Sequence, residues 1–343
     1  MLNIFLLLLS IGVSGGGTFS IAAVDTATAE FGIAVASRVL DVGYIVPWIE
    51  PAIGAVATQA LANPYLGRWA LEEMEKGKTA EEVLKIIIDR DSTPEERQVG
   101  IVDAKGNAAA FTGKNTLSWA GHRTEAGVSI QGNILAGPEV INCMFEKFQK
   151  TEGPLAERLL AALEAGEAAG GDRRGKQSAA LYVWRKRGGY QGANDQLVIL
   201  KVVDNPEPVK ELRREYELWQ YAFLAPAYIR LATEEQDRTS IFLDRAHALL
   251  VKALNSNMDN AEVYNSLAWE FALRKVYPEE VITAAERAHK LDPDDPNIMD
   301  TLAEAYYAAG DYKKAIHWER SALKIEPNNK FFQKQLERFK KRK

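Results

Sequence analysis

The sequence predicts an α+β domain followed by an all-α region, and three observations lead to this prediction. Short runs rich in valine, isoleucine and alanine, typical of strands, occur only before about residue 205. From about residue 206 the pattern is helical and repeats at about 34 residues. Between the two lies the segment Asp204–Pro208, whose two prolines interrupt both helices and strands.

The composition excludes several classes of protein. The chain has 343 residues, 42 basic and 47 acidic side chains and a net charge of −5. This balance argues against a nucleic-acid-binding protein, which needs a basic surface. One cysteine excludes a disulfide framework and a multi-cysteine metal site, and three of the four histidines lie beyond residue 240. We therefore expect neither a metal nor another cofactor.

Residues 1–17 have features of a secretory signal peptide. Ile4–Leu9 form a compact apolar run, and Gly15 and Gly17 are small residues of the kind that a signal peptidase reads. The run is too short for a transmembrane helix, which takes about 20 apolar residues, and the usual basic residue before it is missing. We expect export to the periplasm or the extracellular space, without a membrane span in the mature chain; otherwise the protein is cytoplasmic.

Strands and helices are expected to alternate between residues 18 and 205, which we take as one domain. Proline or a polar cap opens the helices, as in Asn63-Pro64 and in the capping box Thr79–Glu82. Strands are expected at 18–24, 31–37, 53–58, 98–103, 108–112, 128–131, 179–185 and 197–203, and helices from 64, 79, 138 and 154. This order predicts sheets that are covered by helices.

The segment 241–343 resembles the tetratricopeptide-repeat family over about 100 residues, after connecting helices at 206–240. Two units, 261–295 and 296–329, have alanines and aromatic residues at the family's packing positions, although Met299 and Glu319 depart from the pattern. A capping helix is expected at 331–343. The resemblance implies a solenoid that binds a protein or peptide partner, and a spacer or a dimerisation arm is the alternative.

Thr18 is the residue on which catalysis would depend. It follows the small-residue segment directly and begins the first expected strand. If the Gly17–Thr18 bond is cut, Thr18 has a free α-amine with an unperturbed pKa of roughly 7.7–8.0. That amine can take the proton of the residue's own hydroxyl near neutral pH. On its own, a threonine after glycines would be an ordinary start of a strand.

Six segments of the first domain give this threonine its context, because together they resemble the domain-of-unknown-function 1028 family. They are Thr18–Ile21, Ile33–Arg38, Gly54–Ala60, Trp119–His122, Gln131–Glu139 and Gly170–Ser178. The resemblance covers about residues 18–208 and places the chain in the N-terminal-nucleophile (Ntn) hydrolase superfamily. It implies a four-layer αββα sandwich, with the nucleophile at the start of the first strand. It also implies hydrolysis of amide bonds in a small molecule or a peptide, although the family has no settled substrate.

The region around Arg38 looks like the Asp-Ser-Arg pattern of proteasome β subunits, with two departures. Ala36 stands at the position of the aspartate, and no lysine occurs at Ile45 or Val46, where the second orienting group is expected. Arg38 could compensate by lowering the pKa of the amine, or it could bind a substrate carboxylate. A structural ion pair is the third interpretation of this residue.

Other polar residues at the ends of expected elements complete the candidate site. Asn133 could donate its amide to an oxyanion. Asn63 could equally be a helix cap, Asp172 and Arg173 could pair with each other, and His122 could be structural. The candidates for substrate binding are Thr58, Gln59, Asn63, Gln131, His122, Asp172 and Arg173.

The sequence therefore predicts an exported amidohydrolase or peptidase with an interaction module. Two alternatives stay open: a non-catalytic binding domain of the same fold joined to that module, and a scaffold in which the repeats are the whole function. Because domains and repeats of these kinds often associate, a homo-oligomer is an open alternative to a monomer.

Overall fold

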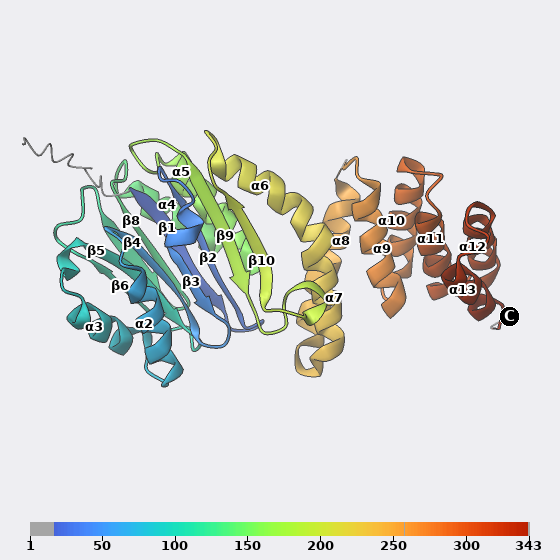
Figure 1. The fold of residues 1–343 in the computed structure, drawn as a ribbon, viewed down its shortest axis with the longest axis horizontal. Helices are drawn as coiled ribbons and strands as arrows, with labels where there is room; N and C mark the ends of the chain where they lie inside the picture. The colour runs from blue at the N-terminus through green and yellow to red at the C-terminus, as the bar shows by residue number, and fades with distance from the viewer. Residues whose placement is uncertain (1–16, 257, 342–343) are drawn as a thin grey trace, which may run out of the picture.

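The computed structural model of the protein describes residues 17–256 and 258–341. Two stacked sheets form the N-terminal part, and helices extend from one edge of them to the C-terminus (Figure 1). The signal-like segment lies outside the described residues, apart from Gly17. No helix in the described ranges combines the length and the apolar character that a bilayer crossing requires.

Every neighbouring pair of strands in the two sheets is antiparallel. The six-stranded sheet has the order β10-β9-β2-β1-β8-β7, with β1 (Thr18–Asp25), β2 (Glu30–Ser37), β7 (Gly121–Glu125), β8 (Val128–Asn133), β9 (Ser178–Trp184) and β10 (Gln196–Val202). The four-stranded sheet has the order β3-β4-β5-β6, with β3 (Pro47–Glu50), β4 (Gly54–Ala60), β5 (Arg97–Asp103) and β6 (Ala108–Thr112). Strand β1 is thus central, with β2 and β8 on its two sides.

The sheets lie face to face between two layers of helices. Alternation along β1 explains this packing: Phe19 and Ile21 contact the outer helices, whereas Ala22 and Val24 face the second sheet. The helices α4 (Glu139–Lys150) and α5 (Leu155–Ala168) cover the six-stranded sheet, and α2 (Pro64–Glu75) and α3 (Ala80–Arg90) cover the other. The order of layers is therefore helix, sheet, sheet, helix.

Three elements of this domain were not among those expected from the sequence. They are the short helix α1 (Val42–Ile45) and the strands β3 and β7. Strand β3 has four residues and begins with a proline, so it contains too few positions for a visible alternation. Strand β7 reads Gly-His-Arg-Thr-Glu and lies at a sheet edge, where solvent accepts polar side chains.

From residue 208 onward the described chain is helical. The elements are α6 (Pro208–Trp219), a π-helical turn (Gln220–Leu224), α7 (Ala225–Glu234), α8 (Thr239–Asn255), α9 (Ala261–Arg274), α10 (Pro278–Leu291), α11 (Pro296–Ala308), α12 (Tyr312–Ile325) and α13 (Lys330–Lys340). Helices α9 and α10 pack as a pair, as do α11 and α12, and α11 also contacts both helices of the first pair. The two expected repeat units therefore form a stack, with α13 at its end.

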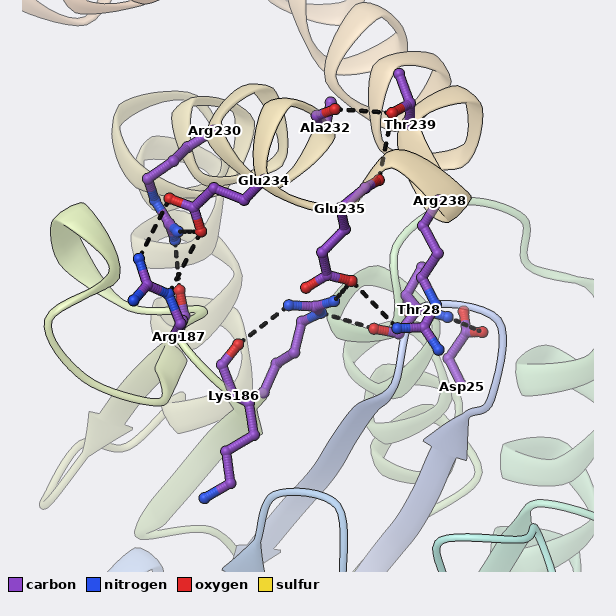
Figure 2. A network of polar contacts seen from close by, with 11 residues as sticks. Asp25, Thr28, Lys186, Arg187, Arg230, Ala232, Glu234, Glu235, Arg238 and Thr239 are labelled. Carbon is purple, nitrogen blue, oxygen red and sulfur yellow. Dashed lines mark hydrogen bonds and ion pairs between the residues drawn. The ribbon is translucent and has the colours of Figure 1, made fainter.

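Buried and half-buried ion pairs join the helices to the edge of the sandwich (Figure 2). Arg185, 2% exposed at the end of β9, donates to the carbonyl of Thr28 at 2.7 Å and pairs with Glu235 after α7. Arg230 of α7 pairs with Glu234 at 2.9 Å and donates to the carbonyl of Arg187. One hydrophobic core continues from the sandwich into the repeats, so the helices form an extension of the domain.

Arg245 of α8 makes a second buried ion pair between the helices and the sandwich. This ion pair allows a test of how much such contacts stabilise the protein. Its guanidinium pairs with Asp25, and it lies 3.5 Å from the carboxylate of Glu30, which is fully buried. Replacing Arg245 by methionine leaves both carboxylates without their cation and should lower the free energy of unfolding by about 3–5 kcal/mol. Urea unfolding measures this, with R214M at an exposed pair as the control. An equal loss of unfolding free energy in R245M and R214M would contradict a stabilising role for the buried ion pair.

An unusual group of acids lies inside the last repeat. Asp300 and Glu304 of α11 and Glu319 of α12 are 4%, 1% and 0% exposed. Two side chains of α13 meet Glu304: Arg338 pairs with it, and Gln335 donates to it at 3.2 Å. Burial raises the pKa of Glu319 well above its ordinary value, and the negative charge of the adjacent Asp300 raises it further. Glu319 therefore keeps its proton to a higher pH than a solvent-exposed glutamate does.

This shift predicts a pH dependence of stability. The folded state holds the proton of Glu319 more tightly than the unfolded state does. The stabilisation is therefore complete below the unfolded pKa and is lost as the pH rises toward the folded pKa, by up to about 1.4 kcal/mol per pH unit. We expect E319Q to have a flatter stability profile between about pH 5 and pH 8 than the parent chain. E75Q, at an exposed position, is the control; parallel profiles for E319Q and the parent would contradict the account.

Candidate active site

Thr18 begins the central strand and is buried between two partner strands. It is paired with Ser37 of β2 on one side and with Asn133 of β8 on the other, so the three side chains share one face of the sheet. Only 4% of Thr18 is exposed, and its hydroxyl donates to the Ser37 hydroxyl at 3.0 Å. That face of the six-stranded sheet packs against the four-stranded sheet. Thr18, as the first residue of β1, lies at one end of the space between the two sheets.

The carbonyl group that precedes Thr18 is held by two donors. The hydroxyl of Ser37 donates to the oxygen of Gly17, and Nη2 of Arg174 donates to the same oxygen at 2.9 Å. One donor comes from β2, and the other from the loop between α5 and β9. The hydroxyl of Thr18 and a carbonyl group that accepts two hydrogen bonds are therefore adjacent along the chain.

Asp172 fixes the guanidinium of Arg174 in that position. Its carboxylate accepts from Nε of Arg174 at 3.1 Å and from Nη2 at 2.7 Å, a bidentate pair. It also accepts from the backbone N–H groups of Arg38 and Arg174, both at 3.0 Å. Because Asp172 is buried and its oxygens are engaged by several donors, its carboxylate has little freedom to move.

The structure assigns different positions to the arginines of this region. Arg173, which the sequence suggested as the partner of Asp172, is exposed, and its backbone N–H donates to Ile134 at 3.0 Å. The partner is Arg174, which the sequence analysis missed. Arg38 is exposed, and its Nη1 donates to the carbonyl of Arg174 at 2.7 Å. The cation that reaches the residue before Thr18 is therefore Arg174.

A buried network of amide side chains supports the site from the space between the sheets. Gln59 of β4 donates to the carbonyl of Thr18 at 3.2 Å and to Gln98 of β5 at 2.8 Å. Asn133 donates to the same oxygen of Gln98 at 3.1 Å. Gln131 donates to Ser20 at 2.7 Å, in the interior of the sandwich. Gln98, which was not among the expected residues, thus connects Gln59 with Asn133.

Three expected residues lie outside this arrangement. Thr58 belongs to the face of β4 that packs on the helices, and its hydroxyl makes a long contact of 3.4 Å with the carbonyl of Asn63. Asn63 caps α2 and donates to Asp91 at 2.6 Å, which is its structural interpretation. His122 is exposed on β7, with Nδ1 at 2.8 Å from the hydroxyl of Thr112. None of the three forms a side-chain hydrogen bond with Thr18.

The hydrogen bonds around Thr18 limit how its hydroxyl could be activated. Within residues 17–256 and 258–341, that hydroxyl bonds to Ser37 and to no histidine, lysine or carboxylate side chain. A serine hydroxyl with an ordinary pKa is too weak a base to take the proton. An intrinsic base is available only if the α-amine of Thr18 itself is free.

With the geometry established, comparison with known proteins places the first domain in a family. The chain belongs to the family of unknown function (DUF1028), whose model matches residues 18–212, so the resemblance drawn from its six segments is confirmed. A crystal structure of the same family, protein SPO2555 from Silicibacter pomeroyi, is 32% identical with a TM-score of 0.56. The match covers 61% of this chain and 89% of that chain.

The comparison for the helical region is weaker. A crystal structure of TTC0263, a thermophilic TPR protein in Thermus thermophilus, is 22% identical with a TM-score of 0.32. The match covers 38% of this chain and 68% of that chain. A TM-score of this size does not establish a shared fold, so the repeat assignment depends on the 34-residue sequence pattern and on the stacked helix pairs. No curated protein matches the chain.

Proposed function

We propose that the first domain is an Ntn-type amide hydrolase whose nucleophile is Thr18. The observation that carries this proposal is the position of the Thr18 hydroxyl, which donates to Ser37, directly after a carbonyl that accepts from Ser37 and Arg174. Removal of residues 1–17 would free the α-amine and vacate the position of the Gly17 carbonyl. The two donors would then be available to a substrate carbonyl next to the same hydroxyl.

The proposed reaction has two steps that share these groups. Oγ1 of Thr18 attacks the amide carbon while the α-amine of Thr18 takes the hydroxyl proton. Ser37 and Arg174 donate to the oxyanion, the C–N bond breaks, and the leaving amine takes the proton from the α-amine. Water, deprotonated by the same amine, then hydrolyses the ester and returns the hydroxyl of Thr18. The products are a carboxylic acid and an amine.

Arg174 could also replace the positive charge of the lysine that proteasome β subunits have near their threonine. Fixed by Asp172, its guanidinium lies within hydrogen-bonding reach of the residue before Thr18. A positive charge there would lower the pKa of the α-amine and keep it neutral as a base near pH 7. We assign this role to Arg174 in place of Arg38, whose guanidinium bonds to a backbone carbonyl of the neighbouring loop.

An electrophile that traps N-terminal threonine tests the proposal directly. The chain should be prepared with Thr18 as its first residue and treated with a peptide epoxyketone that has glycine next to the ketone, which forms a ring with both the hydroxyl and the amine. We expect one adduct by intact mass and its location on Thr18 by peptide mapping. The same chain with one alanine before Thr18 is the matched control and should stay unlabelled. Absence of labelling in both forms would favour the non-catalytic binding domain.

For the helical region we propose protein or peptide binding, with the exported protein placing its hydrolase in a complex. The support is the repeat pattern with its stacked helix pairs α9–α10 and α11–α12. Because the core continues from the sandwich into the helices, binding should be tested with the whole chain from Thr18. Crosslinking in the host, with and without residues 296–343, tests it; identical crosslinked partners would contradict a role for the last repeat.

A further inference from the structure

Gly17 occupies a space in which a side chain would collide with Asp172. A methyl group on its Cα would lie 2.6 Å from Oδ1, 2.8 Å from Cγ and 2.9 Å from Oδ2 of Asp172. Such distances are shorter than van der Waals contact, so either the carboxylate or residue 17 would have to move. Position 17, directly before Thr18, therefore has no room for an L side chain.

Neither side of this contact can move easily. The carboxylate of Asp172 accepts the bidentate pair from Arg174 and the backbone N–H of Arg38, and a shift would weaken these bonds together. The carbonyl of residue 17 is held in turn by Ser37 and by Arg174. Arg174 bonds both to the Asp172 carboxylate and to the carbonyl of Gly17. A movement of Asp172 would therefore also disturb the hydrogen bond that holds this carbonyl.

From this geometry we infer that Asp172 determines acyl specificity, so that the site takes amides whose acyl carbon next to the carbonyl carries no group in the position of an L side chain. This inference rests on the proposed function, because it requires a substrate carbonyl to sit where that of Gly17 now lies. The same nucleophile and the same two donors would hold it, with the neighbouring carbon against Asp172. The substrate class is therefore that of acylated glycyl amides and acetyl-type amides.

A matched pair of substrates tests the inference. The chain that begins at Thr18 is given acetyl-glycyl and acetyl-L-alanyl amides of one fluorogenic amine, and kcat/KM is measured for each. We expect the glycyl amide to be hydrolysed about 100-fold faster or more, because displacement of the carbonyl by about 1 Å costs a factor of this order. A ratio near one would overturn the inference while leaving the proposed function intact.

A second measurement follows only the acylation of Thr18. It distinguishes a failure of the proposed specificity from a failure of the proposed function. The p-nitrophenyl esters of the same two acyl groups are incubated with the chain, and the modification of Thr18 is followed by intact mass. Glycyl acylation in excess of alanyl acylation supports the inference, and equal acylation overturns it. If neither ester modifies Thr18, the proposed function is wrong and the inference falls with it.

Variants of Asp172 assign the selectivity to this residue. D172N keeps the size of the side chain, so the ratio of glycyl to alanyl acylation should stay high even if the rate falls. D172A removes the carboxylate, and the ratio should drop toward one. Because the ratio is the readout, a general loss of activity from the freed Arg174 does not imitate the effect. An unchanged ratio in D172A would assign the selectivity elsewhere.

Discussion

Replacing Thr18 by alanine in the chain that begins at this residue should reduce amide hydrolysis by roughly 10³-fold or more. The substitution removes the only atom that forms the proposed ester bond, while the α-amine and the two carbonyl donors stay. Thr18 lies in a fully paired strand, and loss of its hydroxyl removes one hydrogen bond to Ser37. The fold should therefore persist.

Two further variants make this expectation specific. T18S retains a hydroxyl at the same position and should keep substantial activity, because the ester can still form. Thr26 lies in the exposed turn at the opposite end of β1. The variant T26A should therefore hydrolyse amides at the parent rate. Rates on a glycyl amide substrate measure all three. Comparable activity in T18A and T26A would show that Thr18 is not the nucleophile.

Replacing Arg174 by alanine should lower kcat by about 10²–10³-fold, the usual cost of losing one oxyanion donor. The guanidinium is one of two donors to the carbonyl that precedes Thr18, and its loss also leaves Asp172 buried without its ion pair. R174K should recover only part of the rate, because an ammonium cannot make the bidentate pair with Asp172 and reach the carbonyl in the same geometry.

The neighbouring arginine supplies the matched control for this second prediction. Arg173 is exposed and makes its described hydrogen bond through the backbone, so R173A should have little effect on kcat. Thermal unfolding followed by circular dichroism checks that R174A is folded at the assay temperature. If R173A is the more damaging of the two, the assignment of the oxyanion donor is wrong.

Local patterns in the sequence predict most of the sandwich, because its central strands are buried on both faces and therefore consist of short, continuous apolar runs. Strand β1 is an example: its run of isoleucine, alanine and valine predicts a strand, and the structure shows which of these residues face the helices and which face the second sheet. Strands β3 and β7 escaped prediction because one is very short and the other is polar at a sheet edge. Neither has a pattern that differs from that of a loop.

The candidate site was predictable in part, for a related reason. Thr18 stands out because of its position in the chain, and the sheet register then brings Ser37 and Asn133 beside it. Nothing in the sequence separates Arg174 from Arg173, since the conformation of the loop alone decides which of two adjacent arginines turns inward. Gln98 was missed because the contact that makes it central joins two different sheets.

Catalysis by Thr18 requires a free amine on this residue, and the N-terminus of the mature protein shows whether that amine exists. The protein should be purified from its own host and examined by intact mass and N-terminal sequencing. We predict a chain that begins at Thr18 and lacks the mass of residues 1–17. A mature protein that keeps any residue before Thr18 has its amine blocked in an amide bond. That result would contradict the single-residue nucleophile and favour a binding role for this domain.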